Sequence, residues 1–530
     1  MTEAADRLFT NAEVHSLTEP DRVYEAIAVR DGEIARLGSD YEIRFLEGVE
    51  TEVIDCEGRV VLPGFVDAHT HLENLGRHLV HADLSDARSA DECLERLSAR
   101  AAETDDEWIQ GFGYDESEWD EDRDYLTRTD LDRVGDERPV VALRVDMHAA
   151  SLNSVALERF GDDLPDGDVR RGANGEPTGV VVEDAAEAVR AGIAPDYDET
   201  RTLVAAALEY AVERGVTGVH DMVRNSVAPR VYRDLEAADE LPIRVRINYW
   251  ADHVEAVSEV GLATNAGGDR VRTGAIKSYT DGSIGAKTAK LSAPYATADE
   301  GDGAFDGEWS PSGAESTGEW VVAPAELEAL VDRADDDGFQ VAVHAIGDEA
   351  IEAALSALET TADPGESRHR IEHVELATDD QLARMADAGI VASVQPNFHR
   401  WAADGGLYDR RLGEKRRRRT NRLRRMREAG VPLAFGSDCM PLGPLFGVHH
   451  AVNAPTESQR LEVTEALRAY TRDSAFAGFD ERRLGTLEVG KRADLVVLEE
   501  SPWAAADRID AIDVSMTVVD GTVVFDGCDG

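Results

Sequence analysis

One stretch near the start of the chain carries an apolar run into a His-x-His pair, and it reads Val61-Leu62-Pro63-Gly64-Phe65-Val66-Asp67-Ala68-His69-Thr70-His71. The apolar residues predict a strand, or two short strands, buried on both faces. Side chains two positions apart on a strand point the same way, with Cα atoms ~6.6 Å apart. His69 and His71 are therefore candidate ligands of one metal ion. The alternative is a pair of surface histidines in a loop.

Eight apolar segments of the chain have the character of buried parallel strands. They cover residues 65–69, 216–220, 243–249, 273–277, 340–344, 369–373, 390–395 and 431–436. Helix-like segments separate many of them, and this alternation predicts an α/β fold, a distorted (β/α)8 TIM barrel. The long interval between the first two strands predicts an inserted region at about residues 84–200.

Short β segments occur at both ends of the chain, around Asp-Gly turns such as Asp31-Gly32 and Asp520-Gly521. Because chain termini often lie close together, the two ends are expected to form one sheet structure. We predict a small β-sandwich domain built from residues 1–62 and 484–530. The barrel domain would then cover residues 63–483.

Polar residues follow five of the predicted strands, at the end where a barrel builds its active site. These residues are His69 and His71, Lys277, His344, His373 and Asp438. A single short motif could not supply four histidines, a lysine and an aspartate in this order. The set predicts a metal centre.

With these residues, the chain resembles the amidohydrolase superfamily over nearly its whole length. Within the superfamily it is most similar to the branch that includes N-substituted formamide deformylase and the YtcJ-like amidohydrolases. The resemblance rests on residues 61–71, Trp108–Asp115, His148 with Asn153, Val219–Met222, Lys277 with Asp281–Gly285, His344–Asp348, residues 371–374 and residues 435–438.

The resemblance implies a centre of two divalent metal ions, with Zn²⁺ as the expected metal and Mn²⁺, Fe²⁺ or Co²⁺ as alternatives. One ion would be held by His69, His71 and Asp438, and the second by His344 and His373. The centre would lie at the carboxyl end of the barrel strands.

Lys277 would bridge the two ions as a carbamate formed with CO₂. An ammonium group cannot ligate a cation, whereas a carbamate offers two anionic oxygens. The alternative for Lys277 is an ordinary ion pair with Asp281. Asp438 would be the catalytic residue that accepts and returns a proton.

The implied activity is hydrolysis of a non-peptide C–N bond, as in an N-substituted amide or formamide, by metal-activated hydroxide. A cyclic-amide hydrolase or a deaminase on the same barrel is one alternative. A catalytically silent structural homologue is another. Lys277 counts against a deaminase, and the complete ligand set counts against a silent protein.

Three further residues are candidates for substrate binding: His148, Asp281 and Gln395. His148 has the alternative of capping the helix that follows it, and Gln395 that of serving only loop structure. Residues 286–323 are rich in Gly, Ser and acidic residues. They are interpreted either as a lid over the active face or as a solvated insertion.

The chain of 530 residues has 107 Asp and Glu against 55 Lys and Arg, a formal net charge of −52. All but five of its basic residues are arginine, a pattern that resembles proteins of halophiles. Self-repulsion at low salt should then destabilise the fold. We expect a small-molecule amide substrate and no nucleic-acid or membrane partner, and a homo-oligomer is left open.

Four scattered cysteines and the lack of a signal peptide or membrane span predict a cytoplasmic protein. The segment 410–427 breaks the acidic pattern with a dense run of arginines. Docking on an acidic face, within the chain or across subunits, and attraction of an anionic substrate are both compatible with this segment.

Overall fold

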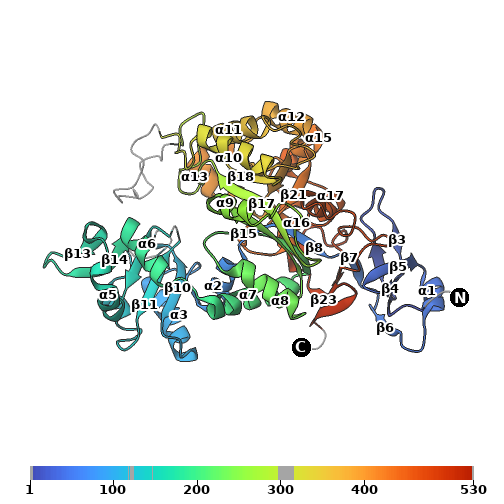
Figure 1. Cartoon of the computed structure of the whole chain (residues 1–530), viewed down its shortest axis with the longest axis horizontal. Coiled ribbons are helices and arrows are strands. Elements are labelled where there is room, and N and C mark those ends of the chain that lie inside the picture. Colours follow the sequence, from blue (N-terminus) through green and yellow to red (C-terminus); the bar gives the residue numbers. More distant parts are fainter. Residues whose placement is uncertain (1–3, 117–118, 120–124, 146, 297–315, 528–530) are drawn as a thin grey trace. The chain divides into compact units, whose positions relative to one another are not determined.

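A computed structural model describes residues 4–116, 119, 125–145, 147–296 and 316–527 (Figure 1). The chain divides into two units. The larger contains residues 1–71 and 208–530, and the smaller contains residues 72–207.

Eight parallel strands form the barrel of the larger unit. In order around the sheet they are β8 (Phe65–Thr70), β15 (Val216–Val223), β16 (Arg244–Trp250), β17 (Val271–Tyr279), β18 (Val341–Ala345), β19 (Arg370–His373), β20 (Val391–Val394) and β21 (Leu433–Phe435). Each of the eight predicted segments overlaps one of these strands. The predicted TIM-like barrel is confirmed, and its strands are nearly continuous apolar runs because both faces of a parallel sheet are covered.

The first and last strands approach each other where the barrel closes. The backbone N–H of Asp438 donates to the His69 carbonyl over 2.8 Å. A side chain at Gly436 would place its Cβ 2.5 Å from the backbone nitrogen of His69. Only glycine therefore allows this approach, which brings residues after β21 beside the end of β8.

Helices of the larger unit lie between the barrel strands and after the last of them. They are α8 (Ala228–Ala237), α9 (Val254–Glu259), α10 (Pro324–Asp336), α11 (Asp348–Leu358), α12 (Asp379–Ala388), α13 (Leu407–Leu412), α14 (Glu414–Arg417), α15 (Leu423–Ala429), α16 (Pro444–Val452), α17 (Val463–Ala469) and α18 (Arg472–Ala477). In α12, Thr378 and Gln381 form a capping box, and the helix ends at Gly389 with φ 68°.

Two further sheets of the larger unit combine both ends of the chain. One contains β5 (Glu33–Gly38), β4 (Ala26–Arg30), β1 (Arg7–Thr10) and β6 (Glu52–Asp55), next to helix α1 (Asp40–Ile43). The other contains β24 (Thr522–Asp526), β23 (Val514–Val519), β22 (Leu495–Leu498), β7 (Val60–Pro63), β2 (Glu13–His15) and β3 (Val23–Tyr24).

A shared core joins these sheets into the predicted β-sandwich. Phe9 and Ile27 from one sheet pack in the same cluster as Val61, Leu495 and Val518 from the other. β7 pairs with β2 on one edge and with β22 on the other. Figure 1 shows the blue N-terminal strands and the red β23 at the same side of the barrel.

The smaller unit contains a mixed sheet of its own. Its strands are β13 (Val169–Arg171), β14 (Pro177–Val182), β12 (Ala149–Leu152), β11 (Val140–Arg144), β10 (Ile109–Tyr114) and β9 (Ala82–Asp83). Its helices are α2 (Leu72–Val80), α3 (Ala90–Glu103), α4 (Arg128–Leu131), α5 (Ser154–Phe160) and α6 (Glu183–Gly192), and α7 (Tyr197–Val212) leads back to the barrel. The unit, residues 72–207, is wider at both ends than the predicted insertion.

Arginines of the segment 410–427 bind acidic groups of the same unit. Arg417 pairs with Asp404 and with Asp409, Arg422 with Asp379 at 2.9 Å, and Arg427 with Asp473 at 2.9 Å. Of the alternatives raised by the sequence, docking within the chain accounts for these side chains.

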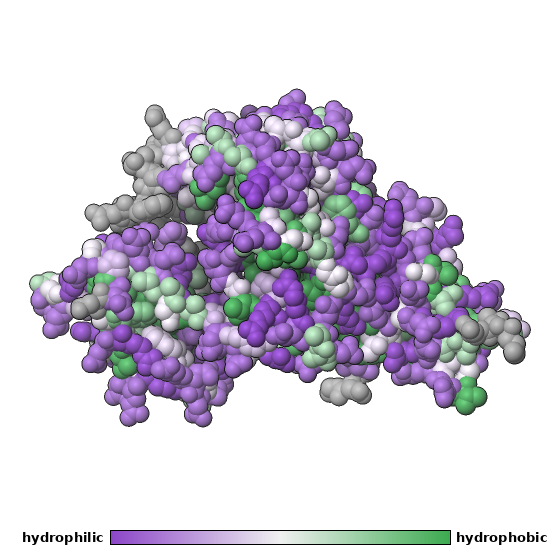
Figure 2. All heavy atoms as spheres, in the orientation of Figure 1, coloured by the Kyte–Doolittle hydropathy of each residue, from purple (hydrophilic) through white to green (hydrophobic). Residues whose placement is uncertain are grey.

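Hydrophilic residues cover most of the face seen in Figure 2, which suits the strongly charged composition. Among the helices of the described residues, none combines the length and the apolar character that a bilayer crossing requires.

Candidate metal centre

Three of the predicted ligands meet at the carboxyl end of the barrel. His69 lies in β8, His71 follows that strand, and Asp438 follows β21. Asp438 Oδ1 lies 3.5 Å from His69 Nε2 and 3.3 Å from His71 Nε2. One ligand atom of each residue lies within 4.8 Å of the other two. No other group of three His, Cys, Asp or Glu side chains in the described residues has this geometry.

Glu372 and Arg370 fix the orientation of the His69 ring. His69 Nδ1 donates to Glu372 Oε2 over 2.5 Å, which leaves Nε2 as the nitrogen with a free lone pair. Arg370 binds the same carboxylate through Nε and Nη2, and its Nη2 also donates to Ser393 Oγ at 2.8 Å. Both side chains are fully buried. A carboxylate behind a metal-binding histidine orients the ring and raises its basicity.

Sequence reasoning missed this pair. Glu372 stands beside His373, and Arg370 stands two positions before Glu372 in the same strand. Two opposite charges at i and i+2 of a buried strand face the same side. That spacing is the signal from which an ion pair supporting His69 could have been inferred.

His344 and His373, at the ends of β18 and β19, lie beside the first group. The ring centres of His344 and His373 are 4.4 Å apart, and those of His69 and His373 are 5.0 Å apart. His373 Nδ1 donates to Gln395 Oε1 at 2.7 Å, and His344 Nε2 donates to the Gly282 carbonyl at 3.1 Å. Each ring thus keeps one nitrogen with a free lone pair.

The buried imidazoles of the centre are uncharged at neutral pH. Burial, reinforced by Lys277, lowers the pKa of His69 to about 4 and that of His344 to about 3. Burial also lowers the pKa of His373 well below its usual value. A metal ion binds the neutral imidazole, so these rings do not need to lose a proton first.

Lys277 lies near the end of β17 with 1% of its surface exposed. Its Nζ is 5.6 Å from the ring centre of Trp250 and 5.9 Å from that of Tyr279. No hydrogen bond or ion pair joins it to Asp281 in the described residues, although that pair was the alternative raised by the sequence. Burial lowers the pKa of Lys277 to about 8, despite the opposing effect of Glu372 and Asp438.

The three predicted substrate-binding residues have different surroundings. Gln395 orients His373, as described above. Asp281 accepts backbone N–H groups of Lys290, Ile346 and Gly347 at 2.8–3.1 Å, which is the bonding of a loop anchor. Contact of either residue with a substrate remains a prediction.

His148 belongs to the smaller unit. Its Nδ1 lies 3.2 Å from Glu183 Oε2, and its side chain is 64% exposed. Its contribution to the substrate pocket remains a prediction.

Only the two ends of the predicted lid belong to the described residues, since 297–315 lie outside them. The two ends run together, because Leu291 N–H donates to the Thr317 carbonyl at 2.8 Å and Tyr295 N–H to that of Ser316 at 3.0 Å. Tyr295 packs in a cluster with Tyr408 of α13.

Aromatic side chains border the centre. The Tyr279 ring lies edge-on to His344 at 5.4 Å, and Trp250 lies edge-on to Tyr279 at 4.6 Å. On the other side, Phe398 stacks on His373 at 6.3 Å. These rings lower the local polarity and so strengthen electrostatic interactions within the site.

Four residues of the centre have the left-handed backbone conformation, which non-glycine residues rarely adopt. They are His373 (φ 74°), Val374 (52°), Asp438 (57°) and Cys439 (55°). Each such residue costs ~1–3 kcal/mol and persists where the surroundings enforce it, commonly at functional sites. Here, Asp438 N–H is held by the His69 carbonyl and His71 N–H by Cys439 Sγ.

The residues present fit a divalent metal ion. His69, His71 and Asp438 supply two imidazole nitrogens and one carboxylate oxygen within one ion's reach. Such a mixed nitrogen and oxygen set suits Zn²⁺ and is compatible with Mn²⁺, Fe²⁺ or Co²⁺. The Glu372–His69 hydrogen bond supplies the outer support that metal-binding histidines usually have.

Comparison with known proteins places this centre in a family context. The chain is 33% identical over 540 residues to the putative amidohydrolase YtcJ of Bacillus subtilis, covering 96% of this chain and 97% of the relative. It is 28% identical to N-substituted formamide deformylase of Arthrobacter pascens, covering 99% of both chains.

A solved structure agrees with the fold. An uncharacterized metal-dependent hydrolase from Pyrococcus furiosus superposes with a TM-score of 0.78 at 30% identity, covering 94% of this chain and 99% of that one. The profile of the Amidohydrolase family matches residues 52–525, which include all the predicted ligands. The chain therefore belongs to the amidohydrolase family, whose solved relatives include metal-dependent hydrolases.

Proposed function

We propose that this protein hydrolyses a non-peptide carbon–nitrogen bond, with an N-substituted amide or formamide as its substrate. The observation that carries the proposal is the cluster of His69, His71 and Asp438, with His344, His373 and the buried Lys277 at its side. The similarity to N-substituted formamide deformylase over the whole chain supports this choice of substrate class.

We propose that the centre holds two ions, with Zn²⁺ as the expected metal. One would be held by His69, His71 and Asp438, and the other by His344 and His373. Bound there, such ions acidify water and polarise a carbonyl group.

Lys277 would join the two ions as a carbamate. The neutral amine forms an N–C bond to CO₂ while one C=O π bond opens, and the nitrogen gives one proton to water, which leaves an anionic group with two oxygens. The lowered pKa of Lys277 supports this step, because more of the amine is then neutral near neutral pH. Arginine could not replace it, since a guanidinium stays protonated.

Asp438 would carry the proton between the attacking water and the leaving nitrogen. Burial raises the pKa of its carboxyl, but the imidazoles around it, above all His69, lower it below the usual range. Asp438 is therefore ionised at neutral pH and can accept a proton. Glu372 would hold the His69 ring in place throughout.

Metal content and turnover together test this function. Wild-type protein, Lys277→Ala and the exposed-site control Lys415→Ala would be purified in molar salt and examined by elemental analysis. All three would then be assayed on N-formyl amines, N-acyl amines and cyclic amides. We expect about two ions per chain in the wild type and in the control, and fewer in Lys277→Ala with loss of turnover.

One ion per chain, unchanged by Lys277→Ala, would exclude the bridge and favour a mononuclear hydrolase or deaminase. Turnover of cyclic amides without turnover of N-formyl or N-acyl amines would replace the proposed substrate class. No metal in folded protein would contradict the catalytic proposal as a whole.

A further inference from the structure

A small cavity lies at the amino end of the barrel strands, opposite the metal centre. It has a volume of about 20 Å³ and lies among β15, β16, β17 and the segment after α18. Five arginines line it: Arg244, Arg246, Arg270, Arg272 and Arg483. The acidic residues in its lining are Asp269 and Asp480. The lining therefore has more positive than negative groups, in a chain whose net charge is −52, although Asp494 and Asp520 outside it pair with Arg244 and Arg270.

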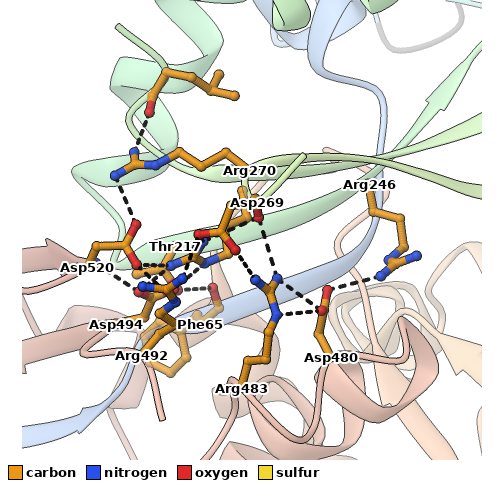
Figure 3. Close-up of polar contacts among 12 residues, drawn as sticks. Phe65, Thr217, Arg246, Asp269, Arg270, Asp480, Arg483, Arg492, Asp494 and Asp520 are labelled. Carbon is orange, nitrogen blue, oxygen red and sulfur yellow. Dashed lines mark hydrogen bonds and ion pairs between the residues drawn. The ribbon is translucent and has the colours of Figure 1, made fainter. Parts of the chain in front are cut away.

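Asp480 is shared by three of these arginines. Arg246 Nη2 and Arg272 Nη1 each bind its carboxylate at 3.0 Å, and Arg483 binds it at 3.0–3.1 Å. Figure 3 shows Arg246 and Arg483 reaching Asp480 from opposite sides. Arg483 also pairs with Asp269, whereas Asp480 is the one carboxylate that pairs with Arg246 and Arg272 in the described residues, so their side of the cavity remains electropositive.

Arg246 is the least compensated member of the group. It is 3% exposed, and its Nε has no hydrogen-bond partner in the described residues. Its other nitrogens bind Asn265, the Thr273 carbonyl and Asp480. A buried donor without a partner is destabilising, so a ligand that accepts from it would be stabilising.

Arg244, in the same strand, is an arginine whose positive charge is fully compensated by carboxylates. Three carboxylates surround it: Asp494 at 2.8 Å, Asp520 at 2.5 Å and Asp269 at 3.4 Å. These partners raise its pKa, whereas burial lowers the pKa of Arg246. The shortage of negative charge is thus located on the Arg246 side of the cavity.

His220, which is uncharged, adds a second hydrogen-bond donor to the same cavity lining. Its Nδ1 accepts from Arg370 Nη1 at 3.0 Å, so the ring proton is on Nε2. Burial lowers the pKa of His220 well below its usual value, and the ring is neutral.

We propose that this cavity binds a single small anion, with chloride as its ligand. The volume of about 20 Å³ accommodates one water-sized particle, which favours a single small ion as the ligand. A halide accepts hydrogen bonds and supplies the missing negative charge, whereas a water molecule supplies no charge. Bound chloride would stabilise the contact between strands β16 and β17 and the segment after α18, which contains Asp480 and Arg483.

Bromide, which replaces chloride and scatters anomalously, locates the ion directly. Crystals of the full chain grown in sodium bromide should show an anomalous peak within the cavity, within hydrogen-bonding distance of Arg246 Nε. A cavity that holds only water at molar bromide would overturn the proposal.

Solution binding is measured by thermal unfolding in sodium chloride against sodium glutamate at equal ionic strength. A ligand that binds only the folded state raises Tm in a saturable way, by about 2–3 °C at a hundredfold excess over Kd for a chain of this size. We expect this chloride-specific rise in the wild type.

Arg272→Gln removes one charge from the cavity and should abolish the rise. The variant is expected to fold, because the side chain is 24% exposed and Asp480 retains its two other arginines. Arg333→Gln is the matched control, since Arg333 forms an exposed pair with Asp337 on α10. It should keep the full chloride-specific rise.

An equal rise in both variants would show that chloride acts on the surface in general and would contradict the site. An anomalous peak with no chloride-specific rise in the wild type would mean binding at crystal concentration only, which also overturns the proposal. Neither readout involves the metal centre, so failure here leaves the proposed hydrolase untouched.

Discussion

Buried polar and charged groups have different surroundings at the two ends of the eight barrel strands. At the carboxyl ends, His69, His71 and Asp438 direct ligand atoms toward one another and leave lone pairs available. At the amino ends, Arg244 is enclosed by carboxylates that satisfy it. The carboxyl end keeps ligand atoms available for metal ions, whereas the ion pairs of Arg244 at the amino end hold strands of the fold together. Burial alone therefore does not mark a functional group; uncommitted donor atoms do.

The largest expected effect is at the carboxyl end. Asp438→Asn should lower kcat by about 100- to 10,000-fold, because the proton carrier is lost while the amide oxygen still occupies the ligand position. Steady-state kinetics on an N-formyl amine and elemental analysis would be measured together, with the exposed-site variant Asp513→Asn as the control. Equal turnover in Asp438→Asn would remove the proposed proton carrier.

The opposite end should respond in stability and not in metal content. Arg244→Met leaves Asp494 and Asp520 without their buried partner and should lower the free energy of unfolding by about 3–5 kcal/mol. Urea unfolding and elemental analysis would be run on the same samples. Arg333→Met, in an exposed pair, should leave the unfolding curve unchanged. Loss of metal in folded Arg244→Met would break the distinction between the two ends.

His399 tests whether burial keeps an imidazole neutral when it is not one of the predicted metal ligands. Burial lowers the pKa of His399 to about 4, and its Nε2 donates to the Asn421 carbonyl at 3.0 Å. As the pH falls, the ring takes up a proton near pH 6.5 in the unfolded chain but only near pH 4 in the folded protein. The wild type should therefore lose up to about 3 kcal/mol relative to His399→Gln as the pH falls from 6.5 to 4.

The measurement is urea unfolding of both proteins at several pH values in that window. The same series on His78→Gln, whose ring is exposed, provides the control. A stability difference between wild type and His399→Gln that is independent of pH would contradict the lowered pKa.

The smallest expected effect concerns the support of His69. Glu372→Gln weakens the hydrogen bond that orients the ring and should reduce metal affinity about 10- to 100-fold. Competition with a chelator at fixed pH measures the change. Glu375→Gln is a matched control, because Glu375 is also buried but binds Tyr408. Equal affinities in the two variants would show that Glu372 does not act through His69.

Much of the fold could be predicted from the sequence because each barrel strand is a nearly continuous apolar run. The segment 243–249, for example, matches β16 at Arg244–Trp250. The same strand also shows where prediction failed, since Arg244 and Arg246 are buried charges within it. Their partners Asp494 and Asp480 are 250 and 234 positions away, a separation that local patterns do not encode.

The candidate site also contains residues that could be predicted from the sequence and residues that could not. His69 and His71 follow from strand periodicity and His-x-His spacing, and the other ligands from the family resemblance. Glu372 was missed because its role depends on a ring 303 positions earlier in the chain. The local sequence pattern predicts which side chains of a strand share a face, and only the tertiary fold determines which residues they contact.

The pairing of β7 has a consequence for how the protein is made. Val61 of β7 pairs with Val497 of β22, so this edge of the strand has no partner until almost the whole chain has left the ribosome. An unpaired edge is a template for association with other chains, and closure over such a separation is slow. During synthesis, the earliest strands of the sandwich therefore depend on the last ones for protection against aggregation.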